Sequence, residues 1–251
     1  MNDLEQEQLF FEIHSNNPRE SPGSFESTQK AFSMLDELSS SPNILDVGCG
    51  PGMQTLDLAR LTEGTITAID THQPYIDRLS NQVQKLDLQN RILTRNLDMS
   101  NLPFSEGEFD LIWSEGAIYN IGFEAGLNYW KSFLKPKGYV AVTEISWLRS
   151  PVSDEAAQFW NTNYPQMQDI ATNLNSIARA GYREIGHFVL PESDWLDNYY
   201  SAIEPKLSML REQYGNDADA MAIIESEQQE IDLYRRHSDE YGYVFYIAQK
   251  S

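Results

Sequence analysis

The chain of 251 residues has the size of one large α/β domain or two small ones, and nothing in it marks a boundary between two domains. Hydrophobic residues make up 41% and aromatic residues 12%, which is enough apolar surface for a packed core and excludes a chain that is disordered throughout. With 18 basic and 38 acidic residues, the formal charge of −20 repels nucleic acid and anionic membranes at long range. We therefore expect no nucleic acid and no membrane as a partner.

Three features predict a cytoplasmic location. Cys49 is the only cysteine, so the chain forms no intramolecular disulfide, and this favours a reducing compartment. The first residues lack the basic start and the apolar stretch of a signal peptide. No apolar segment of about 18 residues, the length of a membrane span, occurs anywhere in the chain.

The chain begins with two expected helices, over 4–14 and 25–38, and then alternates between strand-like and helix-like runs. This alternation is typical of a parallel sheet that is covered by helices on both faces. The expected strands lie at 43–47, 65–70, 91–97, 109–114, 138–146, 184–190 and 242–249.

Two further segments, 148–182 and 194–240, are mostly helical and too long for simple connections. We expect them to cap one end of the sheet, and we interpret the charges in 216–240 as a solvated helix face. The whole chain, 1–251, is then one domain: N-terminal helices over 1–40, a ligand-binding core over 41–147, the cap, and the last strand at 242–249.

The first strand runs directly into glycines at every second position, Gly48, Gly50 and Gly52. Glycine has no Cβ, so such a turn lets the backbone come very close to a ligand. The fingerprint of dinucleotide-binding proteins needs its third glycine at position 53, which is Met53 here. The spacing thus disfavours a nicotinamide cofactor and leaves other nucleotide-like ligands open.

Acidic residues follow the next two strands. Asp70 ends the second strand, where a carboxylate can accept both hydroxyls of a ribose, although Asp70 can also serve as a plain helix cap. Asp98 and Met99 follow the third strand and reach the rim of the same crevice, although Asp98 can also simply start a turn. Together with the glycine turn, these acids indicate a nucleoside site.

With these motifs, residues 20–250 resemble the class I S-adenosylmethionine-dependent methyltransferases. Within that family the chain is similar to small-molecule methyltransferases of the ubiquinone/menaquinone-biosynthesis type and to uncharacterised bacterial relatives that share the segment 113–122. The resemblance implies a Rossmann-like sheet of seven strands, mostly parallel, with an antiparallel last strand. It also implies that S-adenosylmethionine is the cofactor, bound by Asp46, Gly48, Gly50 and Gly52 (methionine part), Asp70 (ribose), Asp98 and Met99 (adenine), and Ser114 in the motif beside the methyl group.

A sulfonium methyl is already activated, so its transfer needs a nucleophile held in line, and a base only if that nucleophile is protonated. The candidates are Glu115, Tyr119 and Glu144, with Asn120 beside them and His187 as a weaker choice. Each of them can equally be a capping or supporting hydrogen-bonding residue. The other histidines (His14, His72 and His237) show no metal-ligand spacing, so we expect no metal.

Aromatic residues are dense in the expected cap, where they can line an apolar or cation-stabilising pocket or simply pack between helices: Trp147, Trp160, Tyr164, Trp195, Tyr199 and Tyr200. Cys49 is interpreted as a small buried packing residue. The sequence thus predicts an enzyme that transfers a methyl group from S-adenosylmethionine to an O, N or S atom of a small organic molecule. The alternatives are a non-catalytic S-adenosylmethionine-binding protein and, less favoured, a nicotinamide-dependent oxidoreductase.

Overall fold

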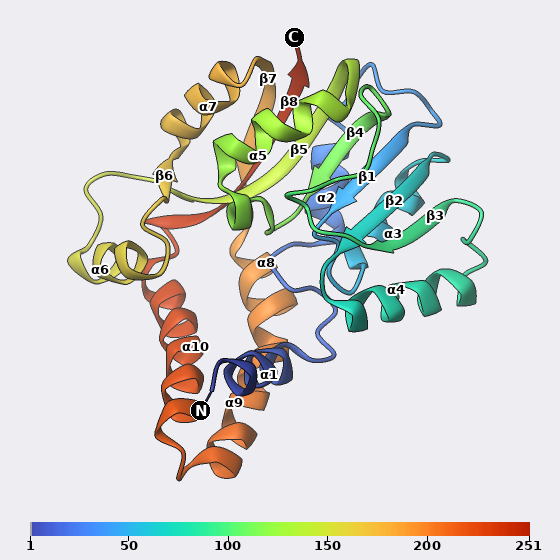
Figure 1. Ribbon diagram of the computed structural model, residues 1–251. Coiled ribbons are helices and arrows are strands. Elements are labelled where there is room, and N and C mark those ends of the chain that lie inside the picture. Colours follow the sequence, from blue (N-terminus) through green and yellow to red (C-terminus); the bar gives the residue numbers. More distant parts are fainter. Residues whose placement is uncertain (1) are drawn as a thin grey trace.

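The computed structural model describes residues 2–251, and a twisted mixed sheet forms its centre (Figure 1). The strands are β1 (Asn43–Val47), β2 (Thr65–Asp70), β3 (Ile92–Asn96), β4 (Phe109–Ser114), β5 (Leu134–Trp147), β6 (Gln168–Asp169), β7 (Tyr182–Val189) and β8 (Tyr241–Lys250). All seven predicted strands are present, within a few residues of their predicted ends. The prediction missed β6, because a two-residue strand is too short to produce a hydrophobic period.

The strand order is β3-β2-β1-β4-β5-β8-β7, and β6 pairs with the end of β5. Strands β1 to β5 are parallel, whereas β8 is antiparallel to both β5 and β7. The expected mostly parallel sheet with an antiparallel last strand is confirmed, with β6 as an eighth strand. The chain order reverses between β1 and β4, and in sheets of this kind ligands bind beyond the carboxyl ends of the strands at that point.

Helices cover both faces of the sheet. The helices α2 (Phe25–Phe32), α3 (Met53–Leu61) and α4 (Gln73–Lys85) pack on one face, and α5 (Phe123–Trp130) and α7 (Ile170–Arg179) pack on the other. The predicted helix 25–38 is too long, since α2 ends at Phe32. The Ser33 hydroxyl donates to the Lys30 carbonyl, and such side-chain bonds compete with the helical ladder.

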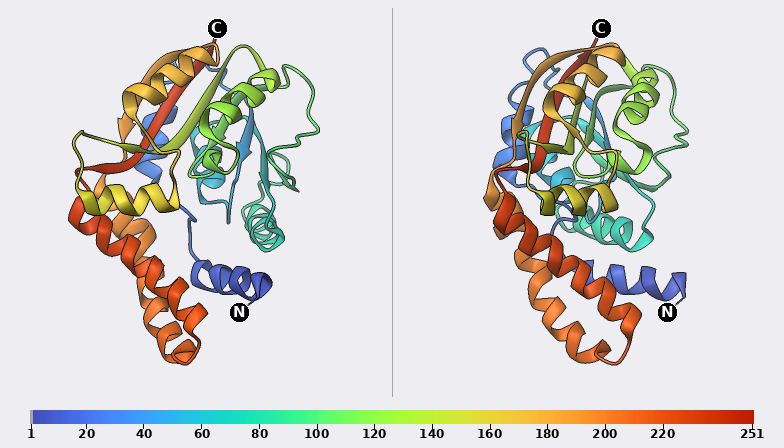
Figure 2. Two further views of the ribbon diagram at one scale, coloured as in Figure 1. Left: turned by 60° about the vertical axis from the view of Figure 1, so that its left-hand side comes forward. Right: turned by 90° about the vertical axis from the view of Figure 1, so that its left-hand side faces the viewer.

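The remaining helices form a cap with its own apolar core beyond one end of the sheet (Figure 2). They are α1 (Asp3–His14), α6 (Asp154–Asn163), α8 (Glu192–Trp195), the π-helical turn η3 (Leu196–Tyr200), α9 (Ser201–Tyr214) and α10 (Ala218–His237). The predicted cap segment 148–182 therefore needs a correction. Only α6 belongs to the cap, because Ile177 and Ala180 of the α7 region pack in the core of the sheet.

Within the described residues 2–251, no helix is both long enough and apolar enough to cross a membrane.

Candidate active site

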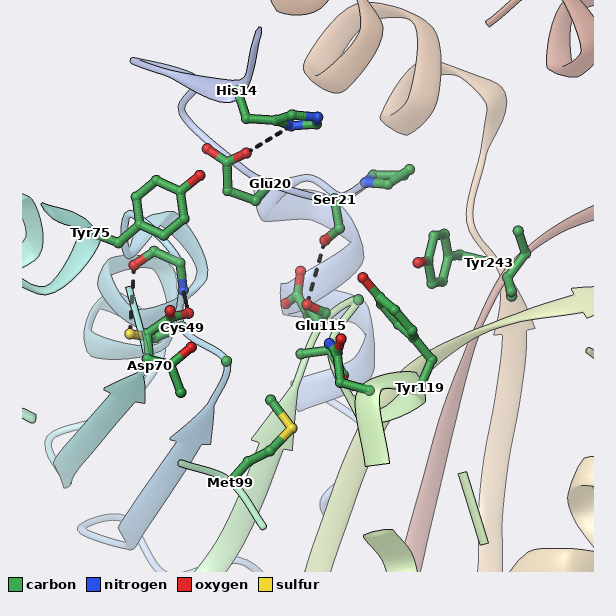
Figure 3. A pocket seen from close by; sticks show the side chains of 18 of the residues that line it. His14, Glu20, Ser21, Cys49, Asp70, Tyr75, Met99, Glu115, Tyr119 and Tyr243 are labelled. Carbon is green, nitrogen blue, oxygen red and sulfur yellow. Dashed lines mark hydrogen bonds and ion pairs between the residues drawn. The ribbon is translucent and has the colours of Figure 1, made fainter. Parts of the chain in front are cut away.

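A cavity of about 820 Å³ lies between the carboxyl ends of the parallel strands and the cap. One end of it, called here the glycine end, is lined by Gly48, Gly50, Asp70, Asp98 and Met99. The opposite end, called here the aromatic end, is lined by Tyr119, Trp160, Tyr164, Tyr199 and Tyr243. Figure 3 shows Asp70 on one side of this space, Tyr119 and Tyr243 on the other, and Met99 between them. One continuous cavity thus joins the nucleoside residues to the aromatic residues.

The glycine turn has the geometry that the sequence predicts. Gly48 has φ +69°, and a Cβ built on it would lie 2.3 Å from the Cβ of Ala117. Gly52 has φ +96°, and its Cβ would lie 2.2 Å from Cδ1 of Leu79. Left-handed backbone in such crowded positions is accessible only to glycine, so these contacts hold the turn in place. A Cβ on Gly50 would instead point into more open space, with nothing closer than Glu20 Cγ at 3.5 Å.

The two predicted nucleoside acids both face the cavity and both hold the backbone. Asp70 accepts hydrogen bonds from the Gly50 N–H at 2.9 Å and from the His72 N–H at 2.8 Å. Asp98 accepts from the Ser100 N–H and hydroxyl, each at 2.8 Å, and these bonds lower the pKa of its carboxyl. Carboxylate oxygens carry further lone pairs, so these bonds leave both residues able to accept from a ligand.

Three of the predicted cofactor residues, Asp46, Gly52 and Ser114, lie behind the cavity wall rather than in it. Ser114 donates to the Val47 carbonyl at 2.9 Å, which joins the ends of β4 and β1. Asp46 is fully buried, and its Oδ2 accepts from the Thr55 hydroxyl, while its Oδ1 has no hydrogen-bond partner among the described residues. Burial raises the pKa of Asp46 to about 7. These three residues therefore support the glycine turn from behind the cavity wall.

Glu115, a predicted candidate base, lies at the centre of a buried network. Its Oε2 accepts from Arg19 at 2.9 Å, and its Oε1 accepts from Thr28 and from the indole of Trp113, each at 2.9 Å. Arg19 also pairs with Asp57. Burial raises the pKa of Glu115, and Arg19 opposes that shift. Both oxygens are engaged, and the network ties the N-terminal segment to the sheet.

Glu144 and Tyr119 stand at the aromatic end. The Tyr164 hydroxyl donates to Glu144 Oε1 at 2.7 Å, and Glu144 Oε2 has no partner among the described residues. Burial raises the pKa of Glu144 to about 7. The rings of Tyr119 and Tyr164 meet edge to face with centroids 6.0 Å apart. A carboxyl group that titrates near neutrality therefore stands directly behind a hydroxyl of the cavity wall.

The two weaker candidates have different surroundings. Asn120 lines the cavity, and its side-chain amide donates to the Ala117 carbonyl at 3.0 Å. His187 lies outside the cavity wall and contacts Glu184 at 2.7 Å. Its position on β7, which is the sheet edge remote from β1, removes His187 as a candidate base.

Sequence reasoning missed polar residues that distant parts of the chain bring to the cavity: His14 of α1, Glu20 after it, Glu227 and Glu230 of α10, and Tyr243 of β8. The interpretation of 216–240 as a solvated face is wrong at Glu227 and Glu230 of α10, which line the cavity. A signal was present, because Glu227 lies on the same stripe as the buried residues of α10 (Ala220, Ile224, Ile231 and Tyr234). An acidic residue in such a stripe indicates a helix face that meets a polar cavity.

His14 lies between two of these acids, with its Nδ1 3.1 Å from Glu20 and its Nε2 3.8 Å from Glu227. Burial alone would lower the pKa of His14, but the two carboxylates outweigh it and raise the pKa to about 9. The imidazole is therefore charged at neutral pH and balances its neighbours.

The cap aromatics divide into two groups. Trp160, Tyr164, Trp195 and Tyr199 line the cavity, whereas Trp147 and Tyr200 pack inside the cap. Cys49 is fully buried, as expected, and burial raises the pKa of its thiol. Among the described residues, no group of three or more His, Cys, Asp or Glu side chains is arranged to hold a metal ion.

Residues 44–138, which include the glycine turn and both nucleoside acids, match the family described as the methyltransferase domain. The chain therefore carries a methyltransferase domain over these residues. The expected resemblance is thereby confirmed at the level of the class I family, while the likeness to the ubiquinone type stays a prediction.

Known proteins similar to this methyltransferase include the 27-O-demethylrifamycin SV methyltransferase of Amycolatopsis mediterranei, 24% identical over 89% of this chain and 82% of that protein. The chain spans less than half the length of several other curated relatives that it matches. Among solved structures, an S-adenosylmethionine-dependent methyltransferase from Geobacter sulfurreducens in complex with S-adenosyl-L-homocysteine has a TM-score of 0.81 at 19% identity, covering 97% of this chain and 98% of that one. The geranyl diphosphate C-methyltransferase of Streptomyces coelicolor A3(2) has a TM-score of 0.64 at 15% identity, with coverages of 90% and 79%.

Proposed function

We propose that the methyltransferase passes the methyl group of S-adenosylmethionine to an O, N or S atom of a small organic acceptor that binds at the aromatic end. The observation that carries this proposal is the single cavity of about 820 Å³, which has nucleoside residues at one end and aromatic residues at the other. The names of the rifamycin and geranyl diphosphate relatives describe small-molecule acceptors, which supports the same class here. The acidic composition and the single cysteine support a cytoplasmic setting.

The glycine end fits the cofactor that this chemistry needs. Gly48 and Gly50 would hold the methionine part, because the turn offers backbone without a Cβ in the way. Asp70 would accept the ribose hydroxyls, and Asp98 with Met99 would hold the adenine, the carboxylate taking the amine and the thioether packing on the ring. The bound cofactor supplies a methyl group on a sulfonium, whose C–S bond breaks with its electron pair left on sulfur.

The chain's own contribution at the aromatic end is to orient the acceptor and to remove its proton. Tyr119 would orient the acceptor, since its ring and hydroxyl face the cavity. The Tyr164 hydroxyl would accept a proton from the acceptor while passing its own to Glu144, 2.7 Å behind it. A carboxyl with a pKa of about 7 is well matched to such a transfer near neutral pH.

Glu115 has a different role in this proposal. Both of its oxygens are taken by Arg19, Thr28 and Trp113, so a further proton would have to displace an existing bond. We assign Glu115 to positioning, because through Arg19 it holds the segment that carries Glu20 and Ser21 against the glycine turn. Ser21 packs so closely on Gly116 that a Cβ there would lie 2.3 Å from the serine Cβ.

Calorimetry with S-adenosylmethionine and S-adenosylhomocysteine tests the proposal first. We expect both to bind to the folded protein, and a folded sample that binds neither would overturn the assignment. Turnover is then followed as S-adenosylhomocysteine release with a panel of small alcohols, amines and thiols. Cofactor binding with no release across the whole panel would instead favour the non-catalytic binding protein, and a change in NADH absorbance would favour the oxidoreductase.

A further inference from the structure

The aromatic end is walled by rings from separate elements, and Glu230 of α10 lines the same cavity. Tyr199 comes from the π-helical turn η3, Tyr243 from β8 and Tyr119 from the turn after β4. Burial raises the pKa of all three of these hydroxyls, and the charge of Glu230 raises it further. Three tyrosine rings and one carboxylate therefore line the same cavity.

The wall of the whole cavity is acidic. Among the described residues that line it there are six carboxylates, Glu20, Asp70, Asp98, Glu115, Glu227 and Glu230, and no lysine or arginine. The only basic group in the wall is His14. An anionic acceptor would therefore meet repulsion in a region of low dielectric, whereas a cation would be attracted.

Three of these six acids are paired with a basic group, whereas Glu230, like Asp70 and Asp98, has no ion pair among the described residues. Glu115 is paired with Arg19, and Glu20 and Glu227 share the charged His14. The hydroxyl of Tyr200 donates to Glu230 Oε1 at 2.9 Å, and Oε2 accepts no hydrogen bond from a described residue. Glu230 is partly buried. Removing a carboxylate from water without a cation beside it is costly, and a cationic ligand offsets part of that cost.

A second, independent observation points to a ligand at the same end. Trp195 is only 1% exposed, yet its indole N–H has no hydrogen-bond partner among the described residues. Its side chain lines the cavity, and its ring centroid lies 5.3 Å from that of Tyr243. Buried donors are paired in nearly all native structures, so this one awaits an acceptor atom. A ligand that carries both an oxygen and a cationic group would satisfy Trp195 and Glu230 together.

We propose that the methyl acceptor enters as an organic cation, with its ammonium group beside Glu230 and against the rings of Tyr199 and Tyr243. The inference rests on the proposed function, and it narrows the acceptor class from small organic molecules to those that carry an ammonium group. The methyl group then goes to a separate O, N or S atom of the acceptor, because an ammonium nitrogen has no lone pair with which to attack the sulfonium methyl. Rings of tyrosine attract such cations through their π-faces, and a desolvated site strengthens the attraction. Neutral molecules of the same shape gain neither the attraction to Glu230 nor the attraction to the tyrosine rings.

Choline and its uncharged carbon isostere 3,3-dimethylbutan-1-ol provide the test, since the two differ only in charge. Calorimetry on the full chain saturated with S-adenosylhomocysteine should give a dissociation constant for choline at least about tenfold lower than for the alcohol. The variant Glu230→Gln should remove that preference. The matched variant Glu225→Gln, on the same helix but paired with Arg211 on the surface, should keep it.

Equal or tighter binding of the alcohol overturns the inference, and so does the absence of choline binding to protein that has bound S-adenosylhomocysteine. A preference that survives in Glu230→Gln overturns the assignment to that residue. The melting temperature and the S-adenosylhomocysteine affinity of each variant confirm that it is folded. Failure to bind S-adenosylhomocysteine in the first step would instead overturn the proposed function, so the two failures are distinguishable.

Discussion

The two ends of the cavity are lined by different kinds of group, backbone at one end and long side chains at the other. At the glycine end the contacts come from backbone at the carboxyl ends of β1 and β2, held by close packing and by main-chain hydrogen bonds. At the aromatic end they come from long side chains on cap helices and on β8. The first arrangement suits one fixed ligand, whereas the second can change its specificity by substitution without disturbing the sheet. Mutations at one end should therefore leave the other end's ligand unaffected.

The largest effect is expected at the aromatic end, on turnover. Tyr164→Phe removes the hydroxyl in front of Glu144, so the acceptor's proton has no path to that carboxylate. We expect kcat to fall by about 10²-fold or more, the scale of a lost general base, while cofactor affinity stays constant. S-adenosylhomocysteine release measures the rate. Tyr182→Phe, which alters a hydroxyl bonded to the Leu127 carbonyl outside the cavity, is the control. A matching loss of cofactor affinity in Tyr164→Phe would contradict the separation of the two ends.

A second large effect is expected at the glycine end, on binding. In Gly48→Ala the new Cβ meets Ala117 at 2.3 Å, so the turn must shift away from its position. We expect the dissociation constant for S-adenosylhomocysteine to rise by about 100-fold. Gly107→Ala is the matched control, because Gly107 also has a left-handed φ, +67°, but its Cβ would lie 4.0 Å from the nearest atom. Equal affinities in the two variants would mean that backbone strain, and not close approach, decides the effect.

The same contrast decides what the sequence could predict. The glycine turn, Asp70 and the strands around them follow from local patterns, since a buried strand, its turn and its acid are contiguous in the chain. The aromatic end does not follow, because Glu230 of α10 and Tyr243 of β8 reach it only when the cap packs on the end of the sheet. Nothing local distinguishes Glu230 from the other acids of α10, and its partners lie on η3 and β8. Contacts between residues that are far apart in the chain produce no hydrophobic period in the sequence from which they could be predicted.

A smaller effect is expected from the ribose acid. Asp70→Asn keeps the shape of the side chain but removes the charge that strengthens its hydrogen bonds to a ribose. We expect S-adenosylhomocysteine to bind about tenfold more weakly, the scale of one hydrogen bond to a charged group. Asp77→Asn, on α4 outside the cavity and bonded by Gln73, is the control. An unchanged affinity in Asp70→Asn would mean that Asp70 does not bind the ribose and only accepts hydrogen bonds from the Gly50 and His72 amides.

The smallest effect is a pH dependence confined to the aromatic end. Burial, and then the neighbouring Glu227, raise the pKa of Glu230 to about 7, against the opposing influence of the Tyr200 hydroxyl and of charged His14. A raised carboxyl pKa means that the carboxylate forms only as the pH rises through about 7. Choline, whose own charge is fixed, should therefore bind several-fold more tightly at pH 8 than at pH 6, because His14 with its pKa of about 9 stays mostly charged over this range.

The glycine end supplies the internal reference for that titration. The affinity of S-adenosylhomocysteine, measured on the same samples by calorimetry at both pH values, corrects for any general loss of folded protein. In Glu230→Gln the ratio of choline affinities between pH 8 and pH 6 should approach one, since no carboxyl remains to titrate beside the cation. A ratio that persists in this variant would move the titrating group to Glu144, whose pKa is also about 7. The cation would then bind beside Tyr164 and Glu144 rather than beside Glu230.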